Sequence, residues 1–246
     1  MDRLVYTAMT GASHILEQQA TVAHNLANVS TTGFRAQLDS FRAVPVIGGE
    51  LPTRAFVVDA TVGADFSGGS LQLTGRELDV AIQGSGWLAV EKPDGSEGLT
   101  RNGSLKTDEN GVLQTQDGLN VLGEGGPITI PPGVGVTIGK DGTISSIPSG
   151  SQPNSIQVVG RLKLVNPPES NIVRGDDGLF KTKDGSTADA DPTVSVAGSM
   201  LESSNVNAVE CMVSMINLGR NFEMQMKLMT NAENNATKAT QILSLS

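Results

Sequence analysis

The segment "HNLANVSTTGFRAQ", from His24 to Gln37, marks the point where a helical pattern stops and a different kind of sequence begins. Apolar residues recur at helical spacing before it, whereas Gly and Pro become frequent after it. Short amide side chains can bond the free carbonyl groups of a last helical turn. Gly33 can take a positive φ without steric cost, which suits a sharp change of chain direction.

Phe34 follows this glycine directly, in a chain with only 3% aromatic residues. An ordinary helix end and loop would explain Gly33 but not a large aromatic side chain next to it. We therefore predict a corner that serves assembly, with Phe34 as an anchor that pins the following segment to a neighbouring helix. The predicted corner residues are Asn25, Leu26, Asn28, Gly33 and Phe34.

Residues 1–29 carry a narrow apolar stripe on a predicted helix of about residues 3–29. Its members recur every seven residues and are Ala8, Ile15, Val22 and Val29. Residues 201–246 carry a second stripe with the same spacing, which favours a helix about forty residues long. The predicted packing residues of that helix are Met215, Leu218, Phe222, Met229, Ala236 and Leu243.

Each stripe alone is compatible with an amphipathic helix that packs on its own domain. The length of the second helix favours instead a helical partner, because globular helices average about 11–12 residues. The first stripe is the obvious candidate. Both stripes are rich in Ala and Met, so two such helices bury little apolar area. We expect them to be poorly ordered in the isolated monomer.

The middle of the chain is predicted to be β structure. Seven Asp-Gly or Asn-Gly dipeptides between Asp94 and Gly185 are typical of tight hairpin turns, and short apolar runs lie between them. Residues 67–200 therefore form a predicted β-sandwich or distorted barrel, and residues 30–66 a connector with a strand or two. The expected fold is mixed α and β: a discontinuous terminal-helix (coiled-coil) domain plus a central all-β domain.

The formal charge of −9 lies wholly in residues 43–204, where 20 acidic residues face 11 basic ones. This argues against a nucleic-acid partner, which requires clustered Lys and Arg. The two ends are electrically neutral, as crowding of many copies would require. No apolar run approaches the ~20 residues of a membrane span, and Cys211, as the only cysteine, excludes an intramolecular disulfide.

The sequence offers little chemistry. The two histidines, His14 and His24, are ten residues apart on the predicted helix and cannot share a metal within one chain. The G-x-G-x-x-A form at Gly84 precedes a predicted strand, whereas a dinucleotide-binding turn must open a helix. We expect no catalysis, no cofactor, no metal and no small-molecule substrate.

The chain resembles the axial proteins of the bacterial flagellum, the family of rod, hook and hook-junction subunits. The N-terminal signature of that family corresponds to "HNLANVSTTGFR", from His24 to Arg35. Its C-terminal signature corresponds to "LESSNVNAVECMVSMINLGRNFEMQMKLM" from Leu201, followed by "KATQIL" at Lys238. Inner segments such as "TGRELDVAIQGSGWLAV" from Thr74 also resemble rod subunits.

The resemblance implies a non-enzymatic subunit of the proximal rod, the drive shaft in the periplasm. It implies export by the flagellar type III apparatus without a cleaved signal peptide, paired terminal helices in the inner tube, and other rod subunits as partners. On this view Gly33→Val and Phe222→Asp leave the β domain folded and abolish incorporation into rods. Two alternatives remain: a secreted β-domain binding protein that dimerises through its helices, and a polysaccharide-acting enzyme on a β scaffold.

Overall fold

The computed structural model describes residues 3–45, 55–148 and 156–244, and it divides into two compact units. The helical unit comprises Met1–Val29, Ala36–Asp65 and Val206–Ser246. The β unit comprises Ser30–Arg35 and Phe66–Asn205. The mixed α and β class with a central antiparallel β region is confirmed.

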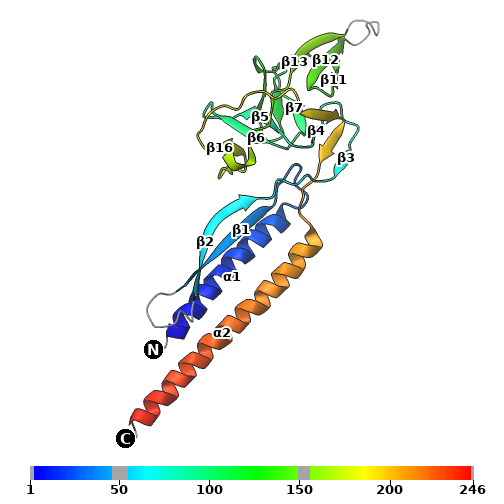
Figure 1. Cartoon of the computed structure of the whole chain (residues 1–246). Helices are drawn as coiled ribbons and strands as arrows, with labels where there is room; N and C mark the ends of the chain where they lie inside the picture. The colour runs from blue at the N-terminus through cyan, green and yellow to red at the C-terminus, as the bar shows by residue number, and fades with distance from the viewer. Residues whose placement is uncertain (1–2, 46–54, 149–155, 245–246) are drawn as a thin grey trace. The chain divides into compact units, whose positions relative to one another are not determined.

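The helical unit contains two long helices, α1 (Arg3–Ala27) and α2 (Ala208–Ser244), drawn side by side in Figure 1. Asn207 caps the start of α2, because its side-chain Oδ1 accepts hydrogen bonds from the backbone N–H groups of Val209 at 3.1 Å and Glu210 at 3.4 Å. At the end of α1, the Asn28 side chain donates to the His24 carbonyl oxygen at 2.9 Å. This is the role expected of Asn28 from the sequence.

The two helices meet where Gly11 faces Gln225. A Cβ atom on Gly11 would lie 3.4 Å from the Gln225 side-chain amide, so the absence of a side chain makes room for that amide. The two helices run antiparallel, so Arg3, eight residues before Gly11, lies beside about residue 233, eight residues after Gln225. The last eleven or so residues of α2 therefore extend beyond the described part of α1.

A hairpin of β1 (Gln37–Pro45) and β2 (Ala55–Ala64) completes the helical unit and lies along α1 (Figure 1). Its first strand is tied to α1 by contacts at every second residue. The contacts are Gln37 with Asn25, Asp39 with Thr21 at 2.9 Å, and Phe41 edge-on to the His14 ring.

Within its described residues, the β unit is built from short antiparallel strands. The strands are β3 (Leu71–Leu73), β4 (Val80–Gln83), β5 (Trp87–Glu91), β6 (Glu97–Thr100), β7 (Leu105–Thr107), β8 (Leu113–Thr115), β9 (Asn120–Gly123), β10 (Gly126–Pro127), β11 (Val134–Ile138), β12 (Thr143–Pro148), β13 (Gln157–Arg161), β14 (Leu164–Val165), β15 (Ile172–Arg174), β16 (Phe180–Thr182), β17 (Ser195–Gly198) and β18 (Met200–Glu202). One 3₁₀ turn, η1 (Glu169–Asn171), precedes β15.

These strands form one large sheet and three smaller ones, and three of the four sheets share a core. The large sheet has the order β15-β16-β6-β5-β9-β8-β7, with β10 on β9 and β14 on β5. The smaller sheets are β11-β12-β13, β17-β4 and β18-β3. Aliphatic residues of three of these sheets, among them Leu88, Ile144 and Val196, form the core cluster.

Six of the seven predicted turn glycines have positive φ values, from 70° at Gly185 to 84° at Gly118. The exception is Gly103, which does not have a positive φ and lies between the unpaired strands β6 and β7. A Cβ atom there would collide with the Val80 carbonyl oxygen, so Gly103 permits close approach of two main chains. The expectation of a hairpin turn at Asn102-Gly103 is therefore wrong.

Candidate functional site

Helix α1 presents three different faces. One carries Ala8 and Ala12, both buried, beside Gly11 and therefore faces α2. A second carries the polar residues that hold β1, namely Thr21 and Asn25. At 100° per residue, these two faces leave a third free for another partner.

The third face of α1 is exposed along its whole length. Its residues recur at alternating spacings of three and four, and none of them is charged. We call this set the outer stripe: Tyr6, Met9, Ser13, Leu16, Ala20, Ala23 and Ala27. Tyr6, Met9 and Leu16 are each half or more exposed, at 58%, 55% and 50%. Such spacing is typical of a helix that packs against a further helix.

Helix α2 also has two apolar faces. Each position of one stripe from Ala208 to Ala236 is partly buried, in a helix otherwise largely exposed. That stripe is Ala208, Cys211, Met215, Leu218, Phe222, Gln225, Met229, Ala232 and Ala236. On another face, Val209, Met212, Val213 and Ile216 form an outer patch in which each side chain is more than half exposed. Of fifteen exposed large apolar residues in the described chain, ten lie on the two helices.

The structure places the predicted packing residues on the face of α1 that contacts α2, on the partly buried stripe of α2, or at the ends of these two surfaces. Ala8 is buried, Ile15, Val22 and Val29 are partly buried, and Met215 to Ala236 lie on the partly buried stripe. The side chain of Leu243 lies outside the described residues. Sequence reasoning missed Cys211 and Gln225, because neither fits an aliphatic pattern, although both have the spacing of the stripe.

The predicted corner residues divide between the two units. Asn25 and Leu26 lie on α1, where the Asn25 amide exchanges two hydrogen bonds with the main chain of Gln37 at 2.8 and 2.9 Å. Asn25 therefore holds β1 and does not serve as a helix cap. Gly33 has the predicted positive φ, at 68°. Gly33 and Phe34 belong to the β unit.

Phe34 is 6% exposed and packs under the guanidinium of Arg174, which lies 4.6 Å from the centre of its ring. Arg174 also donates to the main-chain oxygen of Arg35 at 3.3 Å. Phe34 is thus an anchor within the β unit, whereas the sequence suggested a neighbouring helix as its partner. Burial lowers the pKa of Arg174.

Three further aromatic residues gather in the same part of the β unit. The rings of Phe66, Trp87 and Phe180 are in mutual contact, with centroids 4.6 to 5.9 Å apart. Arg174 lies 5.9 Å from the Phe180 centroid, and Arg101 lies 5.6 Å from that of Trp87. Half of the eight aromatic residues in the chain are therefore found in one cluster.

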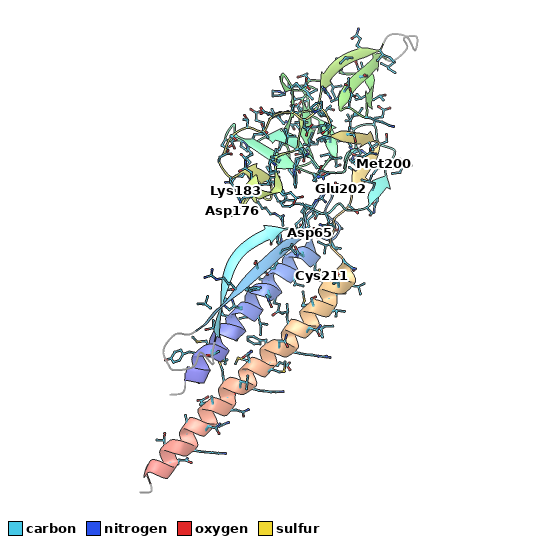
Figure 2. The ribbon with its side chains drawn as sticks, in the orientation of Figure 1. Asp65, Asp176, Lys183, Met200, Glu202 and Cys211 are labelled. Carbon is cyan, nitrogen blue, oxygen red and sulfur yellow. The ribbon has the colours of Figure 1, made fainter. Side chains whose placement is uncertain are left out.

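Beside the aromatic rings lies a buried ionic cluster of Arg35, Arg101 and Glu202, whose side chains are at most 4% exposed. One oxygen of the Glu202 carboxylate accepts a hydrogen bond from Arg35 at 2.7 Å, and the other from Arg101 at 3.3 Å. Figure 2 labels Glu202 at the end of β18, next to Met200. Burial lowers the pKa of Arg101 to about 10, and Glu202 partly offsets that effect.

Sequence reasoning missed this ionic cluster. Arg35 and Glu202 are 167 residues apart, and no local pattern predicts their contact. The available signal was indirect: each lies within a few residues of a predicted helix end. The described residues contain no group of three or more His, Cys, Asp or Glu side chains able to hold a metal ion.

Comparisons with known proteins agree with this architecture. Residues 5–35 match the flagella basal body rod protein family, residues 81–146 the flagellar hook protein FlgE/F/G D1 domain, and residues 197–242 the flagellar basal body rod FlgEFG protein C-terminal family. The chain is 52% identical over its full length to the whole flagellar basal-body rod protein FlgF of Escherichia coli strain K12. The chain belongs to the flagellar rod and hook protein family.

More distant members of the flagellar rod and hook family also align along the full chain. Salmonella typhimurium FlgF is 50% identical, with 100% of both chains covered. Caulobacter vibrioides FlgF is 32% identical, with 99% of this chain and 98% of the relative covered. The corner and Arg35 lie in the matched segment 5–35, Arg101 lies in the segment 81–146, and Glu202 lies in the segment 197–242.

Proposed function

We propose that this chain, a structural subunit of the flagellar basal-body rod by its family, assembles into the shaft through the second apolar faces of its two helices. The observation that supports the proposal is the outer stripe of α1, seven uncharged residues at helical-packing spacing that the chain leaves exposed. A helix with two apolar faces gains stability from two partners, and the second must come from another subunit.

The outer patch of α2 supplies a complementary surface. Val209, Met212, Val213 and Ile216 lie within about one quarter to one third of the helix circumference. When the outer patch of one subunit packs on the outer stripe of a neighbour, two different surfaces meet. The growing assembly therefore always keeps one free outer patch and one free outer stripe at its ends. Contacts of this kind generate an open helical assembly when the rotation does not close.

The partners that we propose are other rod subunits above and below, and no nucleic acid or small molecule. The β unit carries most of the acidic residues and stays solvated around the shaft. No described helix combines the length and the apolar character needed to cross a membrane. We propose torque transmission as the role, without catalysis, since the relatives are named as rod proteins.

We further propose that the subunit is exported by the flagellar type III apparatus and lies in the periplasmic, proximal part of the rod. This rests on the family resemblance. Basal bodies isolated from cells that lack the chain should end in a shaft truncated near the inner membrane. A full-length rod in those cells would contradict the proximal position.

The assembly surface can be tested by adding a charge to it. Ile216→Asp, in the outer patch of α2, is expected to leave the β unit folded and to abolish both motility and incorporation into rods. Leu16→Asp, in the outer stripe of α1, is expected to do the same. The matched control is Asn217→Asp, which adds the same charge at the next, exposed and polar position of α2.

Normal motility of both Ile216→Asp and Leu16→Asp would contradict the proposal.

A secreted binding protein that dimerises through its helices is the second candidate. It predicts a closed dimer, whose sedimentation coefficient stays constant as concentration rises. The proposed open assembly instead predicts species that grow with concentration and disappear in Ile216→Asp.

A further inference from the structure

The chain passes between its two units four times, after residues 29, 35, 65 and 205. Within the β unit, the segments that flank these points come from distant parts of the sequence. They are residues 30–35, residues 66–70 and residues 199–205. Each of them contacts Glu202 or a residue beside it.

The first contacts are to Glu202 itself. The backbone N–H of Gly33 donates to the Glu202 main-chain oxygen at 2.8 Å, and the Arg35 side chain binds the carboxylate. The backbone N–H of Gly69 donates to the same carboxylate oxygen at 2.9 Å. One residue thus holds the segment that follows α1 and the segment that follows β2.

Neighbouring residues extend the same cluster. The Asn205 backbone N–H donates to the Phe34 main-chain oxygen at 3.4 Å, and the Asn205 side chain donates to the Ser67 main-chain oxygen at 3.1 Å. Ser203 donates from its backbone to the Ser70 oxygen at 2.9 Å. A Cβ atom on Gly69 would collide with the Ser203 carbonyl oxygen, so these main chains are in direct contact.

The charge balance makes Glu202 the critical member. Two guanidinium groups share its one carboxylate, and the Nε and Nη1 atoms of Arg35 and the Nε atom of Arg101 have no hydrogen-bond partner among the described residues. Arg101 also donates to the carbonyl oxygens of Ile82 and Gly84, whereas among the described residues the Arg35 side chain donates only to Glu202. Loss of the carboxylate charge leaves two buried cations facing each other, which is strongly unfavourable.

We infer that Glu202 is a positioning residue within the β unit: it clamps together all the segments through which the chain enters and leaves that unit. We call residues 30–35, 66–70 and 199–205, joined through Glu202, the exit clamp. The clamp therefore joins, within the β unit, the segments that lead to α1, β1, β2 and α2. It is a property of the single chain and does not depend on the proposed rod assembly.

The test is hydrogen exchange of the full-length chain, measured by mass spectrometry, for Glu202→Gln. This variant keeps the shape of the side chain and removes its charge. We expect amides of all three clamp segments to exchange at least about 100-fold faster, together, while β5 and β9 remain protected. The matched control is Glu77→Gln, because the Glu77 carboxylate accepts a single hydrogen bond from the Val136 N–H at 3.0 Å in the same unit.

A second variant keeps the inference falsifiable if Glu202→Gln does not fold. Arg35→Met removes one arm of the clamp and leaves Glu202 paired with Arg101. It should release residues 30–35 and leave residues 66–70 protected. Faster exchange confined to residues 199–205 in a folded Glu202→Gln, or an equal rise over the whole β unit in Arg35→Met, would overturn the inference.

Discussion

Gly33 and Arg101 pack main chain against main chain. A Cβ atom at Gly33 would collide with the backbone carbonyl group of Arg101, and the residue also has a φ of 68°. Both constraints require glycine at this position. Because Gly33 belongs to the β unit, a side chain there is expected to disturb that unit as well as any contact between subunits. We therefore withdraw the sequence-based expectation that Gly33→Val leaves the β domain folded.

Gly33→Ala should therefore destabilise the β unit by at least about 3 kcal/mol, from strain at positive φ together with the collision. The control is Gly75→Ala. Gly75 has a φ of 74° but nothing within 4 Å of an added Cβ, so it should lose only about 1–2 kcal/mol. Trp87, the only tryptophan and 4% exposed, reports unfolding of the β unit in urea through its fluorescence. Equal losses for the two variants would show that the close approach is unimportant.

The pair of Phe34 and Arg174 offers a second test. Phe34→Leu removes the aromatic face beneath the guanidinium, and Arg174→Met removes the cation. A double-mutant cycle on β-unit stability should give a coupling of about 0.5–2 kcal/mol, the range of a partly desolvated cation–π contact. The Lys181→Met variant, on the exposed side of β16, serves as the control cation and should show no coupling to Phe34.

The contact of Gly11 with Gln225 predicts the register of the helix pair. In a Cys211→Ser background, Gly11→Cys with Gln225→Cys should react with a short bismaleimide to form an intramolecular cross-link, detected by mass spectrometry. Ser13→Cys with Gln225→Cys should not, because Ser13 lies on the outer stripe, about 200° around α1 from Gly11. Equal yields from both pairs in dilute monomer would support the sequence-based expectation that the helices are poorly ordered alone.

Acid should weaken the β unit through its turns. In four turns an Asp accepts hydrogen bonds from the hydroxyl and the backbone N–H two residues later, and these bonds lower its pKa: Asp94, Asp141, Asp184 and Asp191. Because the folded-state pKa lies below the unfolded one, this stabilisation is complete above the ordinary value of about 4 and is lost as pH falls through the folded value.

The urea midpoint followed by Trp87 should thus stay level from about pH 7 to 5 and fall below about pH 4. Thr143→Val removes the hydroxyl that donates to Asp141 at 2.7 Å and should raise the pKa of that carboxyl toward its ordinary value. Carboxyl NMR titration measures this change residue by residue. An unchanged pKa of Asp141 in Thr143→Val would rule out the hydroxyl as its cause.

The sequence predicted what depends on local spacing. The helices, the glycine turns and the strand at Trp87 follow from periodicity and from residues such as Gly95 and Gly142. Gly103 was misjudged because a dipeptide pattern cannot distinguish a glycine needed for positive φ from one needed for close packing. Asn25 was misjudged in part, because its amide binds the main chain of a strand twelve residues later.

The candidate site was harder to predict because it depends on contacts between distant residues. The partners of Phe34 and Arg35 are Arg174 and Glu202, and no periodicity relates them. The outer stripe was present in the sequence, but it includes Ser13 and three alanines and is hidden beside a stronger aliphatic stripe. The solvent exposure of each face of α1 distinguishes the face that packs against α2 from the outer stripe, and the sequence does not give that exposure.

The exit clamp also sets an order of events during folding. Helices α1 and α2 are about 180 residues apart in the chain, so closing that loop is entropically costly. Once Gly33 and Arg35 are held at Glu202, the remaining loop between the helix ends shrinks to about a dozen residues, which lowers the closure cost by roughly 2.5 kcal/mol. Formation of the β unit is therefore expected to favour later closure of the helix pair.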